Sequence, residues 1–304
     1  MKLKTKNLLT LNELSKKEIE ELISNAIKLK KDLKNGIYKP LLKNKTLAMI
    51  FQKPSTRTRV SFETGMYQLG GHALNISSEE LQLTRGETIE DTAKTLSRYV
   101  DIIMARVYSH EEIEILAKSA MVPVINGLSD SFHPCQILAD LMTIKEKKKK
   151  LSGLKLAWIG DGNNVCNSMI YGCTKTGIDI SIATPKGYEP NQNVVKESKK
   201  FGQVQLLHDP VLAVNGADVV VTDTFVSIHH HATDRTKDFL PKFQINSSLM
   251  KKAKPEAIFL HCLPAKRGQE VTRSVIDGSQ SVVWDEAENR LHAQKSLMLS
   301  LLRV

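Results

Sequence analysis

The chain has 304 residues, of which 41% are hydrophobic and 25% charged, the composition of a globular protein with room for two domains. No apolar run approaches the roughly 20 residues that a membrane span needs, and no signal-peptide core follows the basic start, so we expect a cytoplasmic protein. The formal net charge is +10, but aromatic residues make up only 5% and no nucleic-acid-binding motif accompanies the lysine run at residues 147–150, so we expect the charge to attract an anionic substrate rather than nucleic acid or a membrane.

The first half of the chain alternates predicted helices and strands. Ser15 and Glu18 form a capping-box pattern that begins a helix, and apolar residues then repeat at helical spacing as far as Gly36. The apolar run at residues 46–51 predicts a buried strand, and a helix with a hydroxyl-rich start follows it as far as Gly70. The next predicted elements are a strand at 72–76, a helix at 88–99, and a strand at 102–105 that ends at Arg106.

The second half begins with a long predicted helix at residues 133–150, whose lysine-rich end marks the expected domain boundary. A second alternation follows, with strands predicted at 156–159, 180–183, 218–221, 257–260 and 282–284 and a final helix at 286–302. Such alternation favours parallel sheets. We therefore predict an α/β protein of two domains, each a parallel sheet flanked by helices. Ligands of such sheets bind beyond the carboxyl ends of the strands, so two half-sites facing one cleft are expected.

The turn between the predicted strand at 46–51 and its helix has the chemistry of a phosphate site. Ser55, Thr56 and Thr58 carry hydroxyl groups, and Arg57 carries a guanidinium group that matches phosphate geometry. The first N–H groups of a helix have no partner within the helix, and the helix dipole is positive there. An anion bound at this end therefore accepts hydrogen bonds from these N–H groups and is attracted by the dipole. A capped surface helix with solvated arginines explains the same residues about equally well.

Four motifs in order resemble those of the aspartate/ornithine carbamoyltransferase family. They are Ser-Thr-Arg-Thr-Arg at 55–59, His-Pro-Cys-Gln at 133–136, Gly-Asp-Gly-Asn-Asn at 160–164 and His-Cys-Leu-Pro at 261–264. The match extends from about residue 8 to the C-terminus. The cysteine in the last motif, together with Lys53 before the first, resembles the ornithine branch of the family.

The resemblance implies an activity and an organisation. A carbamoyl group would pass from carbamoyl phosphate to the δ-amine of L-ornithine by direct amine attack, giving L-citrulline and phosphate, with no cofactor and no metal. A carbamoyl phosphate-binding domain would span residues 1–148 and an ornithine-binding domain residues 149–285. Interdomain helices would join the two, the C-terminal helix at 286–304 would return to the first domain, and the chain would assemble as a homotrimer or a multiple of trimers.

The resemblance also implies roles for particular residues. Arg106, His133 and Cys262 would be catalytic, with Arg106 and His133 polarising the carbamoyl oxygen and Cys262 orienting the amine. Carbamoyl phosphate would be bound by these three together with Ser55, Thr56, Arg57, Thr58, Gln136, Leu263, Arg290 and, from a neighbouring subunit, Gln82. Ornithine would be bound by Asn164, Asp223, Ser227 and Ile228.

Several alternatives remain open from the sequence. The family usually has Ser-Met-Gly in its ornithine loop, but here Ser227 is followed by Ile228 and His229, so putrescine or a modified ornithine stays possible as acceptor. Cys262 is either a functional thiol or a buried structural one, since a nucleophile would need a base within reach. The histidines at 229–231 suggest a metal site, although a solvated loop explains them better. Two alternative functions belong to other classes of protein, namely a dehydrogenase and a phosphate-binding protein without catalytic activity.

Overall fold

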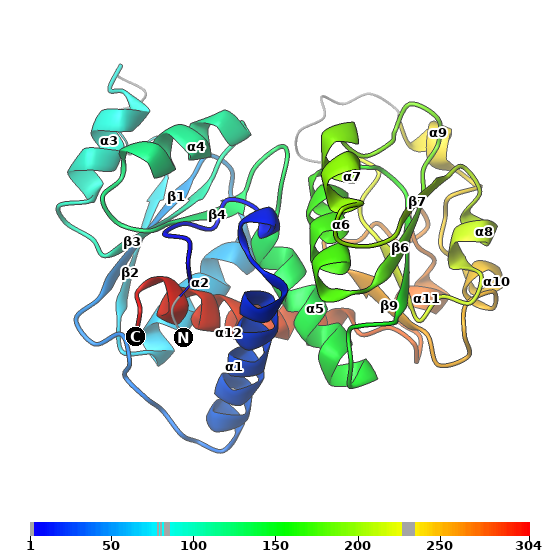
Figure 1. Cartoon of the computed structure of the whole chain (residues 1–304), viewed down its shortest axis with the longest axis horizontal. Coiled ribbons are helices and arrows are strands. Elements are labelled where there is room, and N and C mark those ends of the chain that lie inside the picture. Colours follow the sequence, from blue (N-terminus) through cyan, green and yellow to red (C-terminus); the bar gives the residue numbers. More distant parts are fainter. Residues whose placement is uncertain (1–2, 78, 80, 82–85, 227–234) are drawn as a thin grey trace. The chain divides into compact units, whose positions relative to one another are not determined.

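The computed structural model describes residues 3–77, 79, 81, 86–226 and 235–304. The chain divides into two compact units, Met1–Met142 with Glu288–Val304, and Thr143–Ala287. Each unit contains a parallel sheet flanked by helices, which confirms the predicted fold class (Figure 1). The unit boundaries fall within two helices, α5 (Pro134–Lys148) and α12 (Val283–Leu301). Among the helices of the described ranges, none is both long and apolar enough to cross a membrane.

The sheet of the first unit has the strand order β2-β1-β3-β4, and all its strands are parallel. Its strands are β1 (Thr46–Phe51), β2 (His72–Ser77), β3 (Ile102–Arg106) and β4 (Val124–Leu128). Phe51 pairs with Arg106, so the two central strands end at the same level. This register brings the turn after β1 next to the end of β3.

The helices of the first unit begin at side-chain caps. Ser15 Oγ accepts a hydrogen bond from the Glu18 amide, and the Glu18 carboxylate accepts one from the Ser15 amide, as the capping-box pattern predicted. Apolar side chains of β1, β3, α3 and α4 pack into one core. The helices are α1 (Lys16–Lys34), α2 (Thr56–Gln68), α3 (Ile89–Leu96) and α4 (His110–Ser119), with a short 3-10 helix, η1 (Leu11–Glu13), before α1.

The sheet of the second unit has the strand order β7-β6-β5-β8-β9, again all parallel. The chain builds β5, β6 and β7 outward on one side and then returns to place β8 and β9 on the other side of β5. Neighbouring β5 and β8 are therefore followed by loops that diverge, and such a switch point is where open sheets bind ligands. The strands are β5 (Lys155–Ile159), β6 (Asp179–Ala183), β7 (Val204–Leu207), β8 (Val219–Thr222) and β9 (Ile258–His261).

Within the described residues, six further helices belong to the second unit. They are α6 (Asn164–Thr176), α7 (Gln192–Ser198), α8 (Pro210–Val214), α9 (Thr236–Phe239), α10 (Ser247–Met250) and α11 (Arg273–Ile276). The predicted strand at 282–284 is wrong. Ser281 forms one isolated bridge with Phe259, and Val283 already begins α12. Asp285 and Glu286 lie in the first turn of that helix, where negative charge is favourable, so the helix begins earlier than predicted.

Gly162 in the turn between β5 and α6 shows how closely this turn packs. A Cβ atom at Gly162 would lie 2.2 Å from the Pro190 nitrogen and 2.4 Å from the Glu189 carbonyl carbon, both backbone atoms. The Gly162 amide also donates a 2.8 Å hydrogen bond to the Tyr188 carbonyl. A side chain at this position would displace the turn that precedes α6.

We expect Gly162→Ala to lower the free energy of unfolding by about 3 kcal/mol, because the clash is with backbone that cannot rotate away. Gly216→Ala is the matched control, since its φ of +69° is strained for alanine but no atom lies within 4 Å of the added Cβ. We expect the control to cost about 1 kcal/mol. Denaturant unfolding of both variants measures the difference, and equal costs would show that the turn has room to move.

Candidate functional site

The predicted phosphate turn is the N-terminus of α2. Ser55 is the N-cap, with its hydroxyl accepting from the Thr58 amide at 3.5 Å and donating to Thr58 Oγ1 at 3.0 Å. The Gln52 amide donates to the Arg106 carbonyl at 2.9 Å, which joins the turn to the end of β3. Thr58 is buried and Arg57 is half-buried. The first unit thus brings the hydroxyl groups, the helix N-terminus and the end of β3 to one place.

Arg290 of α12 is buried against this turn within the same unit. Its Nη2 donates to Thr58 Oγ1 and its Nη1 donates to Gln136 Oε1, both at 2.9 Å. Gln136 in turn donates from Nε2 to Asp140 Oδ1 at 2.8 Å. Asp140 was not among the predicted site residues. It stands four residues after Gln136 on α5, one helical turn away, and this spacing is the signal that could have found it.

His133, immediately before α5, is buried among cationic groups. Burial, followed by the positive charges of Arg290, Arg106 and Arg57, holds the pKa of His133 well below its ordinary value of 6.5. The imidazole is therefore neutral at pH 7 and has one N–H with which to donate a hydrogen bond. The three guanidinium groups make the electrostatic potential around this neutral donor positive. Such an environment suits an anion that carries a polarisable carbonyl group.

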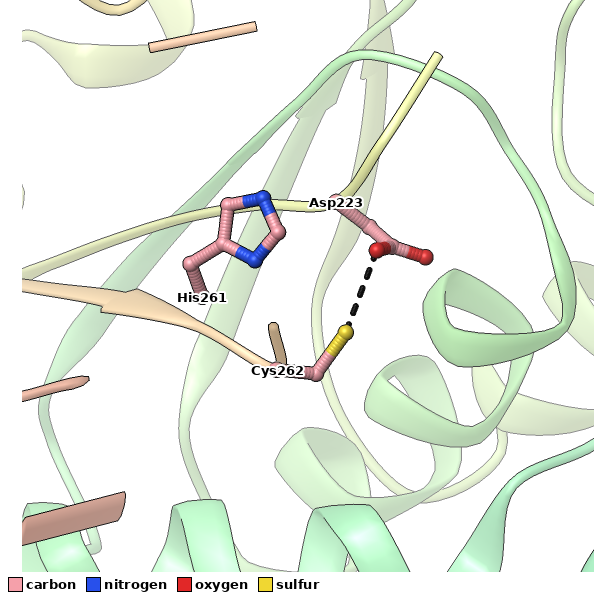
Figure 2. A group of neighbouring side chains, drawn as sticks. All are labelled: Asp223, His261 and Cys262. Atoms are coloured by element: carbon pink, nitrogen blue, oxygen red, sulfur yellow. Dashed lines mark hydrogen bonds between the residues drawn. The ribbon is translucent and has the colours of Figure 1, made fainter. Parts of the chain in front are cut away.

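The second unit brings Asn164, Asp223 and Cys262 together at the carboxyl ends of its strands. Asn164 is the first residue of α6 and is buried, while Asp223 directly follows β8. Asp223 Oδ1 accepts from the Cys262 thiol at 3.1 Å and from the Thr224 amide at 2.7 Å. Figure 2 shows the thiol directed at the carboxylate. The predicted ornithine-binding acid and the predicted amine-orienting thiol are thus in direct contact.

Asp223, His261 and Cys262 each place a possible metal ligand within 4.8 Å of the others (Figure 2). The imidazole of His261 is already engaged on both sides, since Nδ1 accepts from the Leu263 amide at 2.9 Å and Nε2 faces Glu270 Oε1 at 3.1 Å. Cys262 already donates to Asp223, and the lone pair of His261 that would bind a metal is used by a backbone donor. The same bond leaves His261 unable to serve as the base for a Cys262 nucleophile.

Asp161, which is buried, and Arg235, which is partly buried, form an ion pair that was not among the predicted site residues. Arg235 Nη2 lies 3.2 Å from Asp161 Oδ2, and its guanidinium group lies over the Tyr188 ring at 4.8 Å. Burial raises the pKa of Asp161 to about 6, with Arg235 opposing the shift and the negative charge of Asp223 adding to it. Asp161 belongs to the motif at 160–164, which was a usable signal, whereas Arg235 stands outside every motif.

Three predicted site residues lie outside the described residues, namely Gln82, Ser227 and Ile228. The histidines at 229–231 also lie outside them. The remaining predicted residues fall in two groups. Ser55, Thr56, Arg57, Thr58, Arg106, His133, Gln136 and Arg290 belong to the first unit, and Asn164, Asp223, Cys262 and Leu263 belong to the second.

Comparisons with known proteins identify the same family in both halves of the chain. Two family models match it: Aspartate/ornithine carbamoyltransferase, carbamoyl-P binding domain, at residues 6–146, and Aspartate/ornithine carbamoyltransferase, Asp/Orn binding domain, at residues 152–301. The ornithine carbamoyltransferase of Cenarchaeum symbiosum is 61% identical over 301 residues, 99% of each chain.

Solved structures give the same result. The structure of ornithine carbamoyltransferase from Pyrococcus furiosus has a TM-score of 0.94 and 55% identity, covering 98% of this chain and 97% of that one. The anabolic enzyme of the same name from Campylobacter jejuni has a TM-score of 0.92 and 42% identity, covering 99% and 100%.

We expect the imidazole of His133 to be neutral at pH 6.5, where an ordinary histidine is half protonated, because its pKa lies well below 6.5. Histidine-selective ¹⁵N labelling, with the His133 signals assigned by their loss in His133→Gln, measures this directly. Arg290→Met should raise the His133 pKa only in part, since burial is the larger cause. A titration midpoint near 6.5 in the unmodified protein would contradict the buried, cationic environment described above.

Proposed function

Because the chain belongs to the aspartate/ornithine carbamoyltransferase family, we propose that it transfers the carbamoyl group of carbamoyl phosphate to the δ-amine of L-ornithine, giving L-citrulline and phosphate. The observation that carries this proposal is the 61% identity to an ornithine carbamoyltransferase across 99% of the chain. Relatives from several bacteria and archaea carry the same name at 52–58% identity. A putrescine or modified-ornithine acceptor is therefore not favoured.

The phosphate group of carbamoyl phosphate binds at the N-terminus of α2 in this proposal. Ser55, Thr56, Arg57 and Thr58 supply hydroxyl groups, a guanidinium group and free helix N–H groups, and Arg106 adds a second positive charge. The register between β1 and β3 supports this assignment, since it places the end of β3 beside the turn. Fixed donors and charges of this kind need no rearrangement when the anion arrives.

The carbamoyl oxygen is polarised by Arg106 and by the neutral imidazole of His133, with Gln136 and Thr58 beside them. The neutral δ-amine attacks the carbonyl carbon, so that a C–N bond forms and the oxygen takes up negative charge. The tetrahedral centre then collapses, the C–O bond breaks with its electron pair on the phosphate, and the departing phosphate takes the proton that the nitrogen loses. Donors aimed at the developing oxyanion lower this barrier by several kcal/mol. Arg290, which holds Thr58 and Gln136, completes the carbamoyl phosphate site.

Ornithine binds to the second unit through Asn164 and Asp223, together with Ser227 and the Ile228 backbone. Asn164 binds the α-carboxylate, and Asp223 binds the α-ammonium group. Cys262 orients the attacking amine, with Leu263 contributing to the carbamoyl side. The hydrogen bond from the Cys262 thiol to Asp223 supports an orienting role, because it fixes the direction in which the sulfur atom points.

We propose a homotrimer, or a multiple of trimers, in which Gln82 of one subunit completes the site of its neighbour. The outer face of α2 and the edge strand β2 support such an assembly. A groove of about 1000 Å³ on this face is lined by Ser55 and Thr56 of the phosphate turn. Tyr67 and Val60 of α2 also line the groove and are 81% and 54% exposed, so this face offers apolar surface to a neighbouring subunit.

The cellular setting follows from the chemistry and the relatives. All four cysteines are free thiols, which supports the cytoplasm. The Pyrococcus furiosus and Campylobacter jejuni relatives are named anabolic, which supports a role in making arginine.

The experiment that tests the phosphate site is Arg57→Ala. We expect turnover at saturating carbamoyl phosphate to fall at least ~100-fold, because one fixed electrostatic donor is lost, while the thermal midpoint stays within a few degrees. Arg98→Ala, which removes an exposed guanidinium group after α3, is the matched control and should keep its activity. Near-normal turnover by Arg57→Ala would remove this residue from the site.

The shared site is tested by mixing two inactive proteins, Gln82→Ala and Arg57→Ala, under conditions that exchange subunits. In a closed ring of three, each mixed trimer holds one complete site, so an equal mixture should recover about one quarter of the normal activity. Native mass spectrometry of differently tagged subunits verifies the exchange. Verified exchange without recovery would show that each site is built by one chain.

A further inference from the structure

Asn163, the residue just before Asn164, uses its side chain in two directions. It is the N-cap of α6, and its Oδ1 accepts hydrogen bonds from the amides of Val165 at 3.0 Å and Cys166 at 3.1 Å. Its Nδ2 donates to Asp223 Oδ2 at 2.8 Å. One amide group therefore joins the start of α6 to the carboxylate that follows β8.

The orientation of this amide is determined by its surroundings. With the amide turned over, the NH₂ group would face two backbone N–H donors and the oxygen would face the carboxylate of Asp223, and both contacts would be repulsive. Only the orientation described satisfies every partner. The donor to Asp223 is therefore a consequence of the helix cap, and the two contacts cannot be changed independently by rotating the side chain.

Each carboxylate oxygen of Asp223 accepts at least one hydrogen bond. Oδ1 accepts from the Thr224 amide at 2.7 Å and from the Cys262 thiol at 3.1 Å, and Oδ2 accepts from Asn163. Donors on both oxygens fix the rotation of the carboxylate about its χ2 bond. Since Asn164 is the first residue of α6, the cap made by Asn163 also sets the position of Asn164.

We propose that Asn163 is a positioning residue for ornithine, which holds the carboxylate of Asp223 and the side chain of Asn164 in the relative geometry that one amino acid requires. The inference rests on the proposed function, because it assigns the substrate's α-ammonium group to Asp223 and its α-carboxylate to Asn164. Asn163 acts through these two residues and touches neither substrate. The phosphate group of carbamoyl phosphate is held by residues of the first unit in the proposed function, so substitution of Asn163 should affect its binding much less than that of ornithine.

A helix cap with no role in substrate binding is the alternative, and substitutions can separate the two. Ser and Asp cap a helix about as well as Asn, so Asn163→Ser and Asn163→Asp keep the cap but lose the donor to Asp223. Asn163→Asp also places a second carboxylate opposite Asp223. Asn163→Ala loses both contacts. Asn191→Ser is the matched control, because Asn191 caps α7 through the amides of Asn193 and Val194.

The measurements are the thermal midpoint and the KM for each substrate, from citrulline formation by the full-length proteins. For Asn163→Ser we expect a midpoint close to that of the wild type, a KM for ornithine raised ~10-fold or more, and a KM for carbamoyl phosphate within about twofold. Asn163→Asp should raise the ornithine KM further because like charges face each other. Asn191→Ser should leave both KM values unchanged.

Each result that differs from these expectations would overturn one particular statement about Asn163. A normal ornithine KM in Asn163→Ser would show that the donor to Asp223 is not needed, and equal rises in both KM values would show a purely structural role. Either result leaves the proposed function standing, since the wild type still makes citrulline. A wild-type protein that makes no citrulline would overturn the proposed function and this inference together.

Discussion

The first unit depends on one buried cation, the guanidinium group of Arg290. It contributes two hydrogen bonds, one to Thr58 at the start of α2 and one to Gln136 on α5, and so joins residues that are 232 and 154 positions away in sequence. Removing one partner of such a set would leave a buried polar or charged group unsatisfied, which typically costs several kcal/mol. Burial, together with the charges of Arg290, Arg106 and Arg57, lowers the pKa of His133 and keeps its imidazole neutral. In the mechanism that we propose, the same guanidinium groups attract the phosphate, and the neutral imidazole donates to the carbonyl oxygen.

The site residues of the second unit include a negative charge, the carboxylate of Asp223, whereas those of the first unit include positively charged arginines. Asp223 is held by a thiol, a backbone amide and the amide of Asn163, and its carboxylate suits the ammonium group of an amino acid. This arrangement depends on the strand order, because the return of the chain to β8 beside β5 places Asp223 next to the N-terminus of α6. The direct attack that we propose has no covalent intermediate and depends on holding two substrates in line, so it requires accurate contacts of this kind.

Local features of the sequence predicted much of the fold. Contacts between residues far apart in the sequence could not be predicted. The apolar run at 46–51 and the cap at Ser15 were visible because composition and spacing over a few residues determine them. Strand β4 was not predicted, since it contains Asn126 and Gly127, residue types that are depleted in strands. The motifs placed most candidate residues at strand ends, but the pairing of Arg290 with Thr58 and of Asn163 with Asp223 arises only when distant segments pack together. The roles of Gln82, Ser227 and Ile228 are carried by the family resemblance alone.

The identity of the acceptor amine is the central claim. Ornithine and putrescine share a terminal amine with a pKa of about 10.4, so only binding of the α-carboxylate and α-ammonium groups separates them. Product formation from carbamoyl phosphate with ornithine, putrescine or aspartate, measured as kcat/KM on one preparation, tests the claim most directly. We predict citrulline formation from ornithine at least ~100-fold more efficient than reaction with either other amine, since a polar site rejects an analogue that leaves its groups unpaired. Equal or better use of putrescine, or no product from ornithine, would contradict the account.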